Sequence, residues 1–327
     1  MTARYACLVA ALAISIALAS AQTPLTLEKT ISLPGVHGRI DHMAYDTQRA
    51  RLFVAALGSD ALVVVDAKTG AVVHTITGLA EPQGIGLDPD RNQLWVANGR
   101  DGSVRIYDEQ SFHLLRTVLL GDDADNVRRD PETGQMLVGY GAGGIALFDS
   151  NAAQRLNIKL DAHPESFQLE AGTSRIFVNL PNAHRIAVVD RKTGSAVASW
   201  QTDDARANFP MALDQADKRL FAVCRNPVVL LAFDTVTGRI LEKLPTAGDS
   251  DDVFYDAALK RVYVSGGEGV IVVYQQADGD HYAEIARVKT ISGARTSLFV
   301  PSLNRLFVAV REHGGEPAEI RVFETGK

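Results

Sequence analysis

A short strand-like phrase recurs seven times along the chain, and no other feature constrains the fold as strongly. Each copy runs from an arginine or glutamine through two apolar residues, the second usually aromatic, to a valine or alanine. The copies begin at residues 51, 93, 135, 175, 219, 261 and 305, so neighbouring copies are 40 to 44 residues apart. This period is typical of the four-stranded blade of a β-propeller. The repeat therefore predicts an all-β chain, a seven-bladed β-propeller with four-stranded blades.

The residues around each copy predict the other three strands of a blade. In the first repeat, an apolar segment at 43–46 precedes the phrase, and a valine-rich segment at 62–66 follows it. A more polar segment at 72–76 comes last, as expected for an outermost strand that faces solvent. Turns rich in Gly, Asn and Asp separate these segments, and β-branched and aromatic residues fill them without a helical period.

The two ends of the repeat array complement each other. The last repeat has strand-like segments at 298–300, 306–310 and 319–323, and it lacks a fourth. A spare strand-like segment at 27–33 precedes the first repeat. We expect this segment to supply the outer strand of the seventh blade, because that pairing closes the ring and covers an exposed sheet edge.

The first 21 residues are expected to be a signal peptide. Arg4 precedes an apolar run at 6–19, and Ala19-Ser20-Ala21 has the small-x-small pattern of a cleavage site. The run is shorter than the roughly 20 residues of a membrane span. We therefore expect cleavage before Gln22, a single propeller domain at 22–327, no membrane insertion afterwards and an extracytoplasmic (periplasmic or secreted) location.

Composition limits the partners. The net charge is −6 and no basic stripe is present, which argues against a nucleic-acid partner. Of the two cysteines, Cys7 leaves with the signal peptide and Cys224 ends an apolar segment, so we interpret Cys224 as a buried structural thiol. A monomer is expected.

One copy of the repeat carries a family resemblance. Leu94-Trp95-Val96-Ala97-Asn98, with Val-Val-Asp and Thr-Gly elements elsewhere in the repeats, resembles the YVTN-type β-propeller repeat of bacterial extracytoplasmic proteins. The resemblance extends over essentially all of the mature chain. The Asp that ends the third segment is also similar to that of WD40 repeats, although their Trp and recurring Gly-His are missing. Such propellers include binding proteins, lyases, lactonases and redox enzymes, so the resemblance implies a fold and not one function.

The loops that lead into the first strand of each blade are the candidate functional regions, because the copies differ most there. We call the end of the ring where they meet the axial mouth. One aligned position carries a carboxylate in four of the seven copies; it holds Asp41, Gln83, Asp125, Glu165, Phe209, Asp251 and Thr296. The candidate ligand-binding residues are Arg39, Asp41, His42, Asp125, Asn126, Arg128, His163, Glu165, Asn208, Asp251, Asp252 and Arg295. Alternatively, these residues cap hairpins and form solvated ion pairs.

Three chemistries fit this set of residues. Carboxylates and amides are oxygen ligands for Ca²⁺ or Mg²⁺, and histidine would add a preference for Zn²⁺. The candidate ligands for such a divalent cation are Asp41, His42, Asp125, Glu165 and Asp251. Arg39, Arg206 and Arg295 could instead hold an anionic ligand.

Two functions remain open at this point. The first is a binding or scaffold protein that presents a polar, acid-rich mouth to a small ligand or a partner peptide. The alternative is a metal-dependent hydrolase or lyase at the same mouth, as in propellers similar to the gluconolactonase-like and virginiamycin-B-lyase-like groups.

Overall fold

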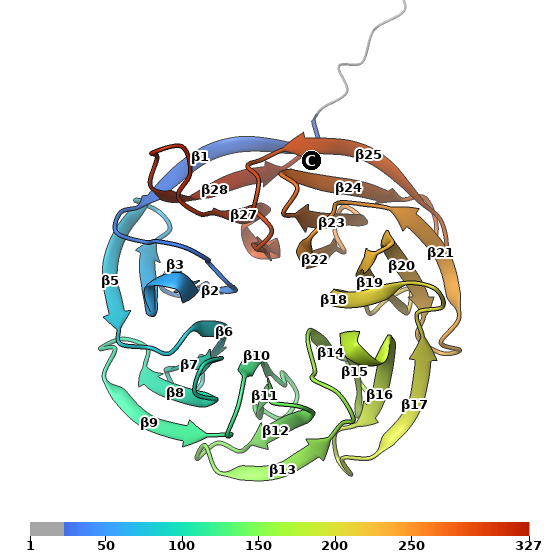
Figure 1. The fold of residues 1–327 in the computed structure, drawn as a ribbon, viewed down its shortest axis with the longest axis horizontal. Helices are drawn as coiled ribbons and strands as arrows, with labels where there is room; N and C mark the ends of the chain where they lie inside the picture. Colours follow the sequence, from blue (N-terminus) through green and yellow to red (C-terminus); the bar gives the residue numbers. More distant parts are fainter. Residues whose placement is uncertain (1–22, 327) are drawn as a thin grey trace, which may run out of the picture.

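The computed structural model describes residues 23–326, and these residues form a ring of seven antiparallel four-stranded sheets (Figure 1). The predicted fold class is thereby confirmed. The expected signal peptide at 1–21 lies outside the described residues. Within the part of the chain that the structure describes, no helix is long and apolar enough to cross a membrane.

Each blade contains four strands, which follow one another from the axis outward. The first four blades are β2 (Met43–Asp46), β3 (Arg51–Ala56), β4 (Ala61–Asp66), β5 (Ala71–Thr77); β6 (Pro82–Asp88), β7 (Gln93–Asn98), β8 (Ser103–Asp108), β9 (Leu114–Leu119); β10 (Ala124–Arg129), β11 (Met136–Tyr140), β12 (Gly144–Phe148), β13 (Gln154–Lys159); and β14 (Phe167–Leu169), β15 (Arg175–Leu180), β16 (Arg185–Asp190), β17 (Ala196–Gln201). The other three are β18 (Arg206–Asp214), β19 (Arg219–Asn226), β20 (Val228–Asp234), β21 (Ile240–Pro245); β22 (Ser250–Asp256), β23 (Arg261–Gly266), β24 (Val270–Gln276), β25 (Tyr282–Lys289); and β26 (Ser297–Val300), β27 (Arg305–Val310), β28 (Ala318–Thr325), β1 (Leu25–Leu33). Short 3₁₀ helices follow three strands: η1 (Leu57–Ser59), η2 (Pro181–Ala183) and η3 (Pro301–Leu303).

The amino-terminal strand closes the ring. β1 lies antiparallel to β28 on the outside of the seventh blade (Figure 1), with Leu33 opposite Ala318 and Ile31 opposite Ile320. The predicted closure is confirmed. Because β1 comes from the start of the chain and β28 from its end, their pairing joins the two ends of the repeat array without leaving the last blade open.

The core lies between the blades, and the repeated phrase builds it. In β3, Leu52 and Val54 pack towards the seventh blade, whereas Phe53 packs towards the second. Side chains alternate along a strand, so a strand buried on both faces must be apolar at every position. Cys224 belongs to one of these inter-blade cores, and burial raises the pKa of its thiol to about 12.

The lead-in loops differ from the prediction in one respect, because four of them are already strand. The innermost strands of blades two, three, five and six begin at Pro82, Ala124, Arg206 and Ser250. Each contains a shift of register near its start, between Pro82 and Ile85, Ala124 and Val127, Asn208 and Met211, and Ser250 and Asp252. A bulge leaves residues out of the ladder and redirects their side chains. The mouth residues Gln83, Asp125, Phe209 and Asp251 lie in these bulges.

Candidate functional site

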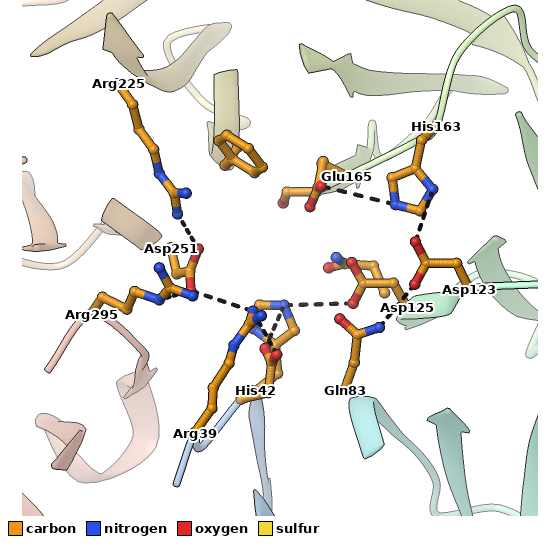
Figure 2. A pocket seen from close by; sticks show the side chains of 14 residues that line it. Arg39, His42, Gln83, Asp123, Asp125, His163, Glu165, Arg225, Asp251 and Arg295 are labelled. Carbon is orange, nitrogen blue, oxygen red and sulfur yellow. Dashed lines mark hydrogen bonds and ion pairs between the residues drawn. The ribbon is translucent and has the colours of Figure 1, made fainter. Parts of the chain in front are cut away.

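The axial mouth contains a cavity of about 160 Å³, which we call the mouth cavity (Figure 2). Six of the seven residues at the aligned position line it; Thr296 is the exception, because its buried hydroxyl donates to the carbonyl of Ile40. Of the sequence-predicted ligand residues, the mouth cavity brings together Arg39, Asp41, His42, Asp125, Asn126, His163, Glu165, Asp251 and Arg295.

Three arginines from different blades form one side of the mouth cavity, which we call the arginine side (Figure 2). They converge on Asp251: Arg295 Nε lies 2.6 Å from its Oδ2, Arg225 forms an ion pair with its Oδ1, and Arg39 Nη2 is 3.8 Å away. The Arg225 guanidinium also lies over the Phe209 ring, 4.0 Å from its centroid. These guanidiniums hold Asp251 in place and present further N–H donors towards the cavity.

The opposite side, which we call the acid–histidine side, carries Asp125, His163 and Glu165, whose potential ligand atoms all lie within 4.8 Å of one another. Asp125 is almost fully buried, and its Oδ1 has no hydrogen-bond partner among residues 23–326. Burial and the nearby Glu165 carboxylate raise the pKa of Asp125 to about 7. Burial and Asp251 likewise raise the pKa of Glu165 to about 7.

His163 is oriented by the backbone. Its Nδ1 lies 2.6 Å from the carbonyl oxygen of Gly141. Because a carbonyl can only accept, Nδ1 carries a proton, and Nε2 is the ring nitrogen that remains for a ligand. Nε2 lies 3.9 Å from Glu165 Oε1. A backbone acceptor on one ring nitrogen is the usual support for a histidine that binds metal through the other.

His42 lies at the base of the mouth cavity between three carboxylates. Its Nδ1 is 3.6 Å from Asp252, and its Nε2 is 3.7 Å from Asp41 and 4.0 Å from Asp125. Burial alone lowers the pKa of His42, but the three carboxylates outweigh burial and raise it to about 10. His42 is therefore an imidazolium at neutral pH, a counterion and not a metal ligand.

The predicted metal-ligand set is consequently divided. Asp125 and Glu165 do lie together, and His163 completes a group of three. Asp41 and Asp251 instead face arginines, since Arg39 Nη2 lies 2.8 Å from Asp41 and Arg295 contacts Asp251. Their negative charge is already compensated by guanidinium groups. The three-residue group offers one nitrogen and carboxylate oxygens, a donor set that suits a divalent cation such as Zn²⁺.

The remaining predicted residues lie elsewhere. Arg128 and Asp252 line a second cavity deeper along the axis. Asn208 does not reach either cavity: its buried side chain donates to Asn179 Oδ1 at 2.9 Å and to the Arg185 carbonyl at 3.1 Å. It fastens neighbouring strands to each other, so its assignment to the mouth was wrong.

Some residues of the mouth cavity were not among the predicted ligand residues. Gln83 donates to Asp123 Oδ1 at 3.0 Å, and Asp123 Oδ2 lies 3.7 Å from His163 Nδ1. Gln83 and Phe209 occupy the aligned position, which was the signal that could have included them. Arg225 lies at the end of β19, the second strand of the fifth blade, and its partner Asp251 belongs to the next blade. The repeat register alone contains no information on such cross-blade contacts.

The comparisons with known proteins support the fold. No protein-family model matches the sequence, and no curated protein matches it either. Among solved structures, a chain of the "Crystal Structure of Mitotic Checkpoint Complex" has a TM-score of 0.78 at 14% identity, covering 100% of this chain and 99% of that one. A chain of Kuenenia stuttgartiensis hydrazine synthase has a TM-score of 0.76 at 16% identity, covering 90% and 99%. At such low identity the likeness shows the propeller fold and nothing finer.

Proposed function

We propose that this chain is an extracytoplasmic, YVTN-type binding protein whose axial mouth takes a small ligand or peptide end that carries charges of both signs. The observation that carries the proposal is the division of the mouth cavity into an arginine side and an acid–histidine side (Figure 2). Arg225 and Arg295 suit a carboxylate or another planar anion. Asp125 and Glu165 suit a cationic group.

The volume of the mouth cavity suits a small ligand. A mouth cavity of about 160 Å³ holds only a few non-hydrogen atoms below the rim, and drug-sized ligand pockets start at about 300 Å³. An amino acid or the end of a peptide would place an ammonium and a carboxylate a few bonds apart, which matches two oppositely charged sides of one small cavity.

The test is a thermal-melting screen with free amino acids and short peptides, with simple carboxylates and amines for comparison. A ligand that binds only the folded state raises the melting temperature. We expect a zwitterion to raise the melting temperature of the wild type. The increase should be much smaller for Asp125→Asn and for Asp251→Asn. Asp90→Asn, at the opposite end of the strands and 69% exposed in its side chain, is the control. A shift that survives both mouth substitutions would place the site elsewhere.

A metal-dependent hydrolase or lyase is the second candidate. The observation in its favour is the group formed by Asp125, His163 and Glu165, in which the backbone holds His163 through Nδ1 and Asp125 Oδ1 has no hydrogen-bond partner among the described residues. A divalent metal held by these residues would polarise a carbonyl of the substrate. The chain's own contribution would be Arg225 and Arg295, which orient a negatively charged substrate from the other side.

Metal content and turnover distinguish the two candidates. The second predicts that purified protein retains a divalent metal, that chelator lowers its melting temperature, and that His163→Gln abolishes both effects. It also predicts turnover of simple esters or lactones by the metal-loaded protein. Metal binding without turnover would leave the binding protein as the function.

The extracytoplasmic location has its own test. It rests on the signal-like residues 1–21. Expression of the full chain in a bacterial host, followed by fractionation and mass measurement, should yield protein outside the cytoplasm that begins at Gln22. Full-length protein retained in the cytoplasm would contradict this part of the proposal.

A further inference from the structure

A second cavity, which we call the inner cavity, lies further along the propeller axis. It has a volume of about 270 Å³ and shares His42 and Ser166 with the mouth cavity. It is less polar than the mouth cavity, because Met43, Ile85, Met211, Phe254 and Leu298 line it together with several polar residues. These residues come from the innermost strands of several blades. A cavity in which apolar walls surround convergent polar groups is a common form of small-molecule site.

Arg128 gives this cavity a positive charge. It lies near the end of β10 and lines the inner cavity. The only hydrogen bond of its side chain to residues 23–326 runs from Nη1 to the carbonyl of Val127, at 3.0 Å. Its guanidinium lies over the Phe167 ring, 5.7 Å from the centroid, and no carboxylate of the described chain lies within 4.0 Å of it. Most of its five N–H donors therefore lack a protein acceptor.

The nearest acid is already engaged. Asp252 lines the same cavity, but its Oδ2 accepts the backbone N–H of Ser297 at 2.8 Å. Its Oδ1 faces the imidazolium of His42 at 3.6 Å. Asp125, the other carboxylate that influences Arg128, belongs to the mouth cavity and also faces His42. The mouth arginines Arg225 and Arg295, by contrast, both contact Asp251.

A partly buried guanidinium without an ion partner is poorly compensated, because the protein takes the place of some of its water. Arg stays protonated in proteins, so it cannot escape burial by losing its charge. Removing part of the hydration of a charge without pairing the charge is unfavourable. A complementary anion in the inner cavity would remove that cost and would satisfy the free donors.

From this geometry we infer that the inner cavity binds a small organic anion, with a carboxylate against Arg128 and a short apolar body against Met43, Met211 and Leu298. The apolar lining favours this class over an inorganic anion, since chloride or phosphate would leave those side chains without a partner. The Ser166 hydroxyl lines the same cavity and offers a further donor. This site adjoins the proposed mouth site, with which it shares His42 and Ser166, but the inference does not rest on a ligand at the mouth.

Calorimetric titration with hexanoate in chloride-free buffer tests the inference. Hexan-1-ol has the same apolar body without the charge, and hexylammonium carries the opposite charge. We expect hexanoate to bind the wild type, and both other probes to bind at least about tenfold more weakly, because a charge-assisted bond to Arg128 is lost. Equal binding of hexan-1-ol, or no binding of hexanoate, would overturn the inference.

Three variants locate the binding. Arg128→Gln should weaken hexanoate binding at least about tenfold. Arg225→Gln, which removes an arginine of the mouth cavity, should not weaken it. If Arg225→Gln removes binding and Arg128→Gln does not, hexanoate binds in the mouth and the inference is wrong. If Arg128→Gln does not fold, Leu298→Trp provides the test. The larger side chain should fill the inner cavity and block hexanoate binding while Arg128 is retained. Hexanoate binding that survives Leu298→Trp would also overturn the inference.

The mouth variants separate this site from the proposed function. Asp125→Asn should leave hexanoate binding in place, and Arg128→Gln should leave the zwitterion-induced melting shift in place. Either proposal can therefore fail while the other holds.

Discussion

His42 shows how much one side chain can link in this propeller. It lines both cavities and lies between Asp41, Asp125 and Asp252, which belong to three different blades. Its charge offsets part of the repulsion among those carboxylates. The protonation state of this single ring therefore contributes to the stability of the whole mouth.

The pH dependence of stability should reveal this role. A folded-state pKa near 10, above the ordinary 6.5, means that the folded state binds the proton more tightly than the unfolded chain. The stabilisation is then complete below pH 6.5 and is lost as the pH rises towards 10. Between pH 7 and pH 10 the free energy of unfolding should fall by about 2–4 kcal/mol more for the wild type than for His42→Gln. Urea unfolding at both pH values measures the difference, and parallel pH profiles would contradict it.

Asp251 is the corresponding residue of the arginine side. Replacing it with Asn removes the carboxylate on which Arg225 and Arg295 converge and leaves two partly buried guanidiniums with less compensation. We expect Asp251→Asn to lower the free energy of unfolding by about 1–3 kcal/mol. Asp90→Asn, which removes an exposed partner of Arg129, should change it by less than about 1 kcal/mol. Equal effects of the two substitutions in urea unfolding would rule out a special role for Asp251.

For individual residues, the sequence predicted which side chains line the mouth better than it predicted the contacts they make. Asp41, Asp125, Glu165 and Asp251 were found because they occupy the same place in each repeat, and they do line one cavity. Their partners were not predictable, since an ion pair such as Arg225 to Asp251 joins two blades. Asn208 was misassigned for the same reason: its acceptors lie on the preceding blade.

At the scale of elements, the bulged innermost strands produce the mouth. A regular strand places alternate side chains on opposite faces, towards the two neighbouring blades. The bulges interrupt this alternation near the start of β6, β10, β18 and β22. Two neighbouring residues then become available to the axis, and in the third blade these are Asp125 and Asn126. The sequence showed these segments as polar and variable, which resembles a loop, so the bulged strands were not predicted.

The bulges of β6 and β10 also bring two backbones together. A Cβ on Gly84 would collide with the carbonyl oxygen of Asp125, so Gly84→Ala must push the two strands apart. We expect a loss of about 1–3 kcal/mol in the free energy of unfolding, together with weaker ligand binding at the mouth because Asp125 moves. Gly279→Ala is the matched control, since the nearest atom to its new Cβ is 3.8 Å away. A Gly84→Ala protein with unchanged stability and ligand binding would show that β6 and β10 tolerate separation.

At the scale of the whole molecule, the blades depend on their neighbours. Each hydrophobic cluster joins two adjacent blades, as Trp95 of the second blade packs on Phe148 of the third. The sequence predicted this architecture almost completely, because the apolar phrase recurs at a period that only one closed fold explains. It could not show what the mouth binds, because the packing that repeats is shared by propellers of many functions.

Deletion of the strand β1 tests whether the ring unfolds as one cooperative unit. Without residues 23–33 the seventh blade loses its outer strand and the core formed by Ile31, Leu33 and neighbouring side chains. If the closed ring unfolds as a whole, this loss must also lower the stability of the blades on the other side of the molecule. The chain has two tryptophans, and they report on distant places: Trp95 lies between blades two and three, and Trp200 between blades four and five.

We expect deletion of residues 23–33 to lower the urea midpoint by the same amount at both tryptophans, measured by fluorescence in Trp95→Phe and Trp200→Phe backgrounds. The physical reason is that each blade is stabilised only through its two neighbours, so an opened seventh blade weakens the first and sixth, and the effect passes around the ring. Intact protein carrying the same tryptophan substitution is the reference for each probe. A midpoint that falls at one tryptophan and stays constant at the other would show that the blades unfold independently, and a deletion protein as stable as its parent would show that β1 is not needed to hold the ring closed.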